Sequence, residues 1–170
     1  TKSVHEALTK QVTDTSVFPY RTTCKVNGNI KNDKVEGTVE GSASLVGPNI
    51  ALTAAHVCFI EYNKEWYTYE NLNFRPGYNG KDDDENIDDG NYKGFSSDYE
   101  QIYFPSSYMI NKDKTYDWAI CVLKKPLGHY LGYFALKHYD NPEDLKQISV
   151  MATGYPAETK YGFNGKSQWE

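Results

Sequence analysis

The sequence predicts an all-β fold, a barrel or a sandwich, on the basis of two observations. Several short runs of β-branched, aromatic and aliphatic residues are separated by Gly, Pro, Asn and Asp, as strands are separated by turns. Apolar residues seldom recur at helical spacing, and tyrosine is abundant, with 15 among 170 residues. A chain of this length can bury a core as one domain or as two small ones.

The first elements expected are a polar segment and a hairpin. Residues 1–14 are polar and should lie on the surface. Residues 19–33 are typical of a hairpin, and Asn27-Gly28 is its expected turn because this pair favours positive φ.

The stretch 40–59 contains two expected strands followed by a histidine. Residues 42–46 and 50–53 are small, β-branched or aliphatic, and Gly47-Pro48-Asn49 between them indicates a tight turn. The second strand leads into Ala54-Ala55-His56, where two alanines leave room beside an imidazole.

Three further stretches have strand character. Residues 62–80 alternate aromatic and polar side chains and predict one or two strands that end near Pro76-Gly77. Residues 118–123 are nearly all apolar, as in a strand buried on both faces, and Pro126-Leu127-Gly128 closes that segment. Residues 147–156 predict another strand.

The net charge of −5 argues against nucleic acid and anionic membrane surfaces as partners. No apolar run approaches the roughly 20 residues that span a bilayer. The first residues lack the apolar region of a signal peptide, so the protein is expected to be cytosolic or already freed of a leader.

The cysteines and the acidic residues bear on metals. An odd number of cysteines (Cys24, Cys58 and Cys121) leaves at least one thiol free or paired outside the chain, and none stands in a zinc-binding spacing. Residues 81–90 are strongly acidic: they form either a solvated loop or a calcium site with Asp82, Asp84 and Asp88 as ligands. The spacing does not fit an EF-hand, so no cofactor is expected beyond this calcium alternative.

His56 and Asp117 each stand at the end of an expected strand. Singly, His56 could be a strand-end histidine without a function, and Asp117 could cap a turn. Their motifs, Thr53-Ala54-Ala55-His56 and Tyr116-Asp117-Trp118-Ala119-Ile120, give the chain its resemblance to the chymotrypsin-like serine proteases. Within that group it most resembles the N-terminal portion of the V8-type bacterial glutamyl endopeptidases. Further matches occur in the family's order at 11–15, 18–21, 45–48, 75–80, 126–128, 153–156 and 168–169.

The resemblance implies a chymotrypsin-like double β-barrel in which the first barrel is complete and the second only begun. Residues 1–128 would form an N-terminal segment and the first barrel, and 129–170 a linker and the start of the second. His56 would be the general base, and Asp117 would hold its tautomer and stabilise the protonated ring. Their separation of 61 positions (117 − 56) is longer than the family pattern, and the acidic loop accounts for the excess.

Two features depart from the family. Disulfide-bearing relatives have cysteines near position 41 and directly after the histidine, where this chain has Gly41 and Val57. Cys58 is therefore expected to pair with Cys24 or stay free, and Cys121 to be a small buried hydrophobe. The family's Gly-x-Ser-Gly-x-Pro segment with the nucleophile is absent from the 170 residues.

The resemblance implies a secreted serine endopeptidase that cleaves after Glu or Asp, and the missing nucleophile segment implies that a companion C-terminal fragment supplies the serine. The alternatives are a catalytically inactive, protease-like binding module and a cysteine protease on the same barrel. By resemblance, the α-amino group of Thr1 could approach the specificity pocket and bind the substrate carboxylate. Glu170 could be a self-processing site, because a glutamyl peptidase leaves Glu at a new C-terminus.

Overall fold

The computed structural model describes residues 10–80, 95–157, 163 and 165–170. Its strands are β1 (Thr23–Lys31), β2 (Glu36–Gly47), β3 (Ile50–Thr53), β4 (Phe59–Tyr62), β5 (Glu65–Thr68), β6 (Asn73–Pro76), β7 (Ser97–Tyr103) and β8 (Ala119–Leu123). Its helical elements are short: η1 (Tyr20–Thr22), α1 (Ala55–Cys58), α2 (Ser106–Asn111), η2 (Lys114–Tyr116), α3 (Leu127–Leu131) and η3 (Pro142–Gln147).

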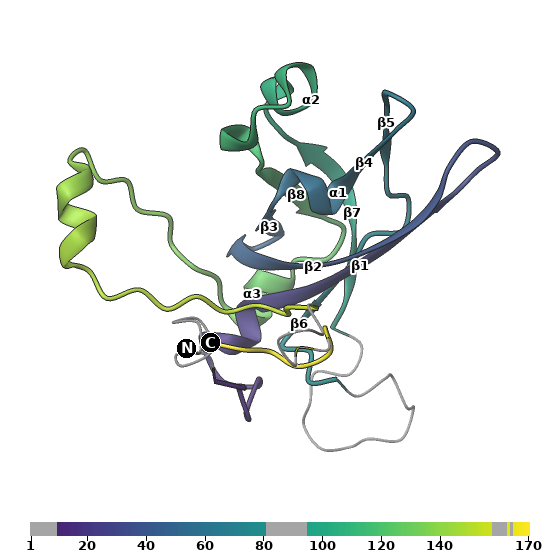
Figure 1. Cartoon of the computed structure of the whole chain (residues 1–170). Coiled ribbons are helices and arrows are strands. Elements are labelled where there is room, and N and C mark those ends of the chain that lie inside the picture. The colour runs from purple at the N-terminus through teal and green to yellow at the C-terminus, as the bar shows by residue number, and fades with distance from the viewer. Residues whose placement is uncertain (1–9, 81–94, 158–162, 164) are drawn as a thin grey trace, which may run out of the picture.

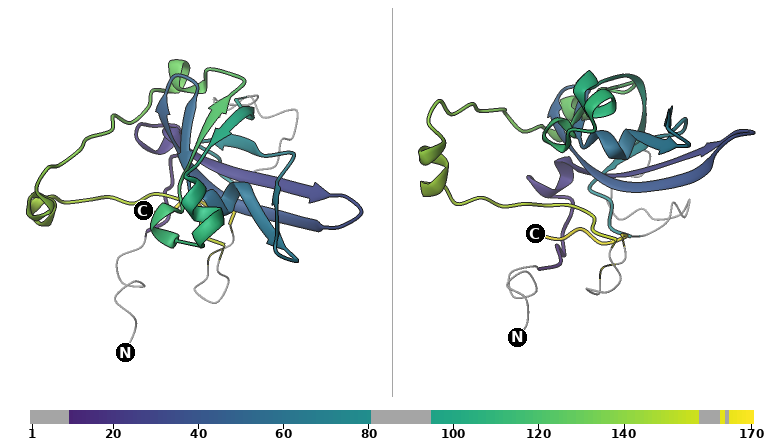
Figure 2. Two further views of the ribbon diagram at one scale, coloured as in Figure 1. Left: turned by 90° about the horizontal axis from the view of Figure 1, so that it is seen from above. Right: turned by 45° about the horizontal axis from the view of Figure 1, so that its top comes forward.

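Six strands close into an antiparallel barrel in the order β1-β2-β3-β8-β7-β6, with β6 pairing back to β1 (Figure 1). Closure leaves this sheet without a free edge. The remaining strands, β4 and β5, form a separate hairpin, and the β1–β2 hairpin reaches well beyond the barrel body (Figure 2). The predicted all-β class and the complete first barrel are confirmed.

Strand β8 contributes one of its two faces to the barrel core. In β8 the side chains of Ala119, Cys121 and Leu123 are buried, whereas Ile120 and Val122 between them are only half-buried. The prediction that residues 118–123 are buried on both faces was therefore wrong. In a closed barrel, alternate residues of a strand face inward and outward, so continuous apolar sequence does not require burial on both sides.

The predicted turn at Asn27-Gly28 was also wrong. Both residues lie within β1, opposite β2, and the chain reverses at 32–35 instead. There the Asn32 side chain accepts hydrogen bonds from the backbone amides of Lys34 and Val35, each at 2.9 Å. Gly28 serves close packing, because a Cβ at this position would lie 2.6 Å from the Leu72 side chain. Glycine is therefore needed at this position for close packing and not for a turn.

Other local expectations are confirmed. Gly47 ends β2 and Ile50 begins β3, which places the turn at Pro48-Asn49 as predicted. The stretch 62–80 contains β5 and β6, and β6 ends at Pro76. Proline lacks an amide donor, so it fits the end of a strand better than the interior.

The chain after α3 has little regular structure. Residues 148–152, within the strand predicted at 147–156, pair with no other strand in the described part of the chain, so that prediction was wrong. Val150 and Met151 there are 86% and 52% exposed. Strand formation depends on a neighbouring strand, which this apolar run does not have here. Figure 1 shows residues 132–153 as a wide loop that stands away from the barrel, with η3 on it.

The final residues return to the barrel. The Tyr155 backbone amide donates to the Ser42 hydroxyl of β2 at 2.8 Å, and Trp169 forms isolated bridges with Gln11 and Gly154. The last barrel strand, β8, ends at Leu123, and the division of the chain at residue 128 stays a prediction. No helix among the described residues is long and apolar enough to cross a membrane.

Candidate active site

His56 is positioned by the end of β3. Thr53, the last residue of that strand, donates its hydroxyl hydrogen bond to the Ser42 carbonyl of β2 at 2.8 Å. Ala54 is still extended, and α1 begins at Ala55, which is fully buried. The small buried side chain lets the turn sit close to the barrel while the imidazole of the next residue points outward. The His56 side chain is 63% exposed.

Asp117 is positioned by a short turn before β8. Asp113 caps η2 by accepting from the Thr115 backbone amide at 2.9 Å, and the Asp117 amide then donates to the Lys114 carbonyl at 3.2 Å. Strand β8 begins two residues later, at Ala119. The Asp117 side chain is 24% exposed, so it is more shielded from water than the imidazole.

The pairing of β3 with β8 brings the two side chains together. Thr53 lies opposite Ala119 in the barrel, which places the segments that carry His56 and Asp117 side by side. His56 Nδ1 is 2.8 Å from Asp117 Oδ2, and the His56 backbone amide donates to Oδ1 at 2.9 Å. Both carboxylate oxygens are therefore engaged by one residue, which holds the carboxylate in a single orientation.

The surroundings of Asp117 favour its ionised form. Partial burial alone raises the pKa of Asp117, but the hydrogen bonds and charge of His56 outweigh it and hold the pKa below its usual range. A carboxylate can only accept, so Nδ1 of a neutral His56 carries the hydrogen and donates it. Nε2 then has a free lone pair, and it has no hydrogen-bond partner among the described residues. This arrangement can accept a proton from a group placed at Nε2.

The wall behind the dyad comes from residues that the sequence patterns did not single out. The rings of Phe59 and Phe104 lie 4.5 Å apart, and those of Trp66 and Tyr108 lie 5.4 Å apart. Lys112 Nζ binds both carboxylate oxygens of Glu61 at 2.7 Å. These contacts pack α2 against the β4–β5 hairpin. Burial, with the Asp117 charge as a secondary cause, raises the pKa of Tyr108.

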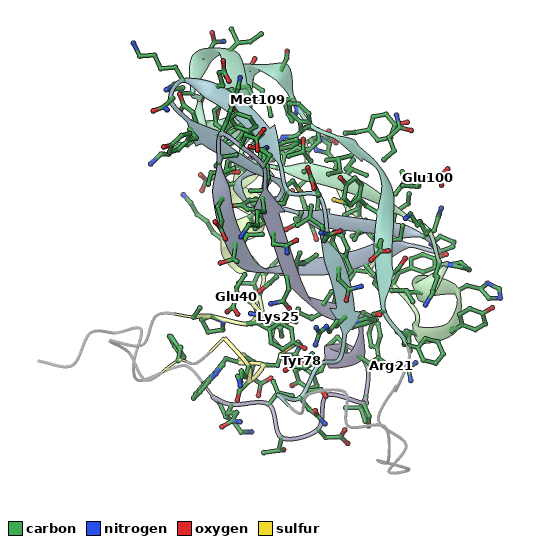
Figure 3. The ribbon with its side chains drawn as sticks, turned by 90° about the vertical axis from the view of Figure 1, so that its right-hand side faces the viewer. Arg21, Lys25, Glu40, Tyr78, Glu100 and Met109 are labelled. Carbon is green, nitrogen blue, oxygen red and sulfur yellow. The ribbon has the colours of Figure 1, made fainter. Side chains whose placement is uncertain are left out.

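A second ion pair joins β1 to β2 (Figure 3). Lys25 Nζ is 3.0 Å from Glu40 Oε2, and the Lys25 side chain is only 2% exposed. Gly165 covers the pair so closely that a Cβ there would lie 2.5 Å from Glu40 Oε2. The sequence signal for this pair was weak, because lysine and glutamate are usually exposed.

The other expected site residues are placed as follows. Thr1 and the calcium candidates Asp82, Asp84 and Asp88 lie outside the described residues, among which no cluster of potential metal ligands occurs. Glu170 pairs through its backbone with Lys10 and accepts a hydrogen bond from the Tyr20 hydroxyl.

Of the two alternatives for Cys58, the structure has the free thiol and not the pairing with Cys24. All three cysteines are free and buried, and Cys58 contacts Cys121 instead.

Comparison with solved structures finds proteases with a similar fold. A Glu endopeptidase in complex with MPD superimposes with a TM-score of 0.59 at 21% identity, over 95% of this chain and 65% of that one. The protease Anisep from Arthrobacter nicotinovorans gives 0.63 at 17% identity, with the same two shares. A thermostable serine protease, AL20, from an extremophilic microorganism gives 0.60 at 20% identity, over 87% of this chain and 62% of that one.

The chain has the fold of the chymotrypsin-like serine proteases. It spans less than two thirds of the length of these proteins, which is consistent with a second barrel that is incomplete here. No family model matches the sequence, and no curated protein sequence is significantly similar to it.

Proposed function

We propose that this chain is the base-bearing part of a secreted serine endopeptidase of the V8 type, which hydrolyses peptide bonds after Glu or Asp. The observation that carries the proposal is the His56–Asp117 dyad at adjacent strand ends of a chymotrypsin-like barrel. Acyl transfer needs this pair, because the base must keep one tautomer and be stabilised when it becomes protonated.

In the proposed mechanism His56 Nε2 takes the hydroxyl proton of a serine as that serine attacks the scissile carbonyl. The ring then carries a positive charge next to the Asp117 carboxylate, which is partly shielded from water. His56 returns the proton to the leaving amine. Asp117 stays ionised throughout, as its lowered pKa favours.

The serine is proposed to lie on a companion C-terminal part of the same precursor. The 170 residues contain no Gly-x-Ser-Gly segment, and the solved proteases are longer than the part that this chain matches. Ser42, whose carbonyl accepts a hydrogen bond from Thr53, has its hydroxyl engaged by the Tyr155 amide. The exposed apolar side chains Val150 and Met151 offer a surface that the companion could cover.

The specificity for Glu is supported by the resemblance of the motifs and by one Glu endopeptidase among the similar structures.

We expect the protein made from its complete coding sequence to cleave an internally quenched peptide after Glu. A matched peptide with Gln in that position should be cleaved at least about 100-fold more slowly, since it lacks only the charge. A fluorophosphonate should label the companion part and abolish cleavage.

A His56→Ala variant should show neither cleavage nor labelling, while its circular dichroism stays that of the wild type. Folded wild-type protein that neither cleaves the peptide nor reacts with the fluorophosphonate would overturn the proposed peptidase activity. It would indicate the inactive binding module instead. Cleavage blocked by iodoacetamide but not by the fluorophosphonate would indicate the cysteine protease. Efficient cleavage after residues other than Glu or Asp would overturn the specificity alone.

A further inference from the structure

Two thiols meet in the core directly behind the dyad. Cys58 is the last residue of α1, the helix that carries His56, and Cys121 is the central residue of β8, the strand that follows Asp117. Their Sγ atoms are 3.7 Å apart although the residues are 63 positions apart in the sequence. Both side chains are fully buried.

The third cysteine is different. Cys24 lies in β1, is equally buried, and forms no hydrogen bond to another thiol among the described residues. The fold therefore distinguishes one close pair from one isolated thiol, which the sequence alone left open.

We propose that Cys58 and Cys121 form a disulfide when the protein folds in the presence of a low-molecular-weight disulfide. An S–S bond is about 2.0 Å long, so the two sulfur atoms need to approach by less than 2 Å from their present separation. In the first exchange one cysteine thiolate attacks the small disulfide, forms a mixed disulfide and releases one small thiol. The other cysteine thiolate then displaces the second small thiol, so two protein thiols are oxidised and one disulfide is reduced.

Oxidation must precede closure of the core. Exchange requires a thiolate, and the Cys121 hydrogen bond together with burial raises the pKa of Cys58 in the folded state. Neither sulfur is accessible to a reagent once the barrel has closed. The bond therefore forms in a partly folded chain and, once formed, is protected from reductants by the same burial.

The bond would join α1 to β8 covalently, beneath the contact between His56 and Asp117. It would hold the two segments together independently of the side-chain hydrogen bonds. The inference does not depend on the proposed peptidase, because it concerns only the core of the barrel.

The test is to refold the wild-type protein with mixed oxidised and reduced glutathione and to isolate the folded monomer. Alkylation in denaturant should then find Cys58 and Cys121 blocked and Cys24 free, against all three free in protein refolded with reductant. Proteolysis and mass spectrometry without reduction should find the peptide containing Cys58 joined to the one containing Cys121. The oxidised protein should melt about 10 °C higher than the reduced one, because the bond closes a long loop.

Cys24→Ala is the matched control: it removes an equally buried thiol and should keep the linked peptide. Cys58→Ala and Cys121→Ala should each remove the link. Wild-type peptide mapping decides the question even if a variant fails to fold. Free Cys58 and Cys121 in the folded oxidised protein, or a link that contains Cys24, would overturn the proposal. So would folded protein obtained only under reducing conditions.

Discussion

The barrel carries two ion pairs, His56–Asp117 and Lys25–Glu40, whose distances are similar but in which the opposite member is buried. His56 and Asp117 are 2.8 Å apart, and Lys25 and Glu40 are 3.0 Å apart. In the first pair the base is 63% exposed and the acid 24% exposed. In the second pair the base is 2% exposed and the acid 51% exposed.

This difference indicates what each pair can do. An exposed imidazole backed by a shielded carboxylate can exchange protons with a group in front of it, while its partner keeps it oriented. A buried ammonium backed by an exposed carboxylate is out of reach of a substrate and fixes the packing around it. The distance within a pair does not separate a candidate catalytic pair from a structural one. The two are separated by which member, the base or the acid, is buried.

The largest effect is expected from Asp117→Asn in the complete enzyme. The substitution keeps the shape of the side chain but allows the wrong imidazole tautomer, so kcat should fall by about 10⁴-fold. Steady-state kinetics on a glutamyl peptide measures this.

Asp113→Asn is the control, because Asp113 is a nearby carboxylate that only caps η2. If Asp117→Asn and Asp113→Asn lost equal activity, or if Asp117→Asn kept near-normal turnover, the distinction between a catalytic and a structural ion pair would be contradicted.

The next largest effect concerns the asymmetry of the second pair. Glu40→Ala leaves the Lys25 ammonium buried without its partner and should cost about 3 kcal/mol in the free energy of unfolding. Lys25→Met leaves a half-exposed carboxylate in water and should cost less than about 1 kcal/mol. Urea unfolding of both variants tests this. Equal losses in the free energy of unfolding would contradict the claim that Lys25 is the buried member of the pair and Glu40 the exposed one.

A smaller effect is expected from pH at the first pair. The pKa of Asp117 is lowered in the folded state, so its ionised form stabilises the fold. This contribution is complete above the unfolded-state pKa, near pH 4, and is lost as the pH falls through the folded-state pKa. The gap in Tm between wild type and Asp117→Asn should thus narrow below about pH 4. A gap that stays constant from pH 5 to pH 2.5 would refute the assigned shift.

The smallest effect is expected from a pair that is exposed on both sides. Lys31 and Glu36 are 3.1 Å apart on the β1–β2 hairpin, with side chains 76% and 71% exposed. Breaking the pair with Lys31→Met should change the free energy of unfolding by less than about 0.5 kcal/mol. A loss comparable to that of Glu40→Ala would show that burial is not what distinguishes these pairs.

Local chemistry was the reliable part of the sequence analysis. The turn at Pro48-Asn49 and the end of β6 at Pro76 follow from the restricted backbone of proline and its missing donor, and both were predictable. The predictions for Asn27-Gly28 and residues 147–156 were wrong because the structure of these segments depends on contacts with residues distant in the sequence. Gly28 is needed for the space beside Leu72, and the apolar run around Val150 has no strand to pair with among the described residues.

By itself the sequence determined the all-β class, the strand ends that carry His56 and Asp117, and the absence of a Gly-x-Ser-Gly nucleophile segment in these 170 residues. These follow from residue types and their order, which act over a few neighbouring positions. Only the tertiary structure decided which side chains meet across tens of positions. The pairing of β3 with β8 brings Nδ1 to the carboxylate and Cys58 to Cys121, and Gly165, near the C-terminus, covers the pair of Lys25 and Glu40. Such contacts depend on strand register and burial, which arise only when the whole barrel closes.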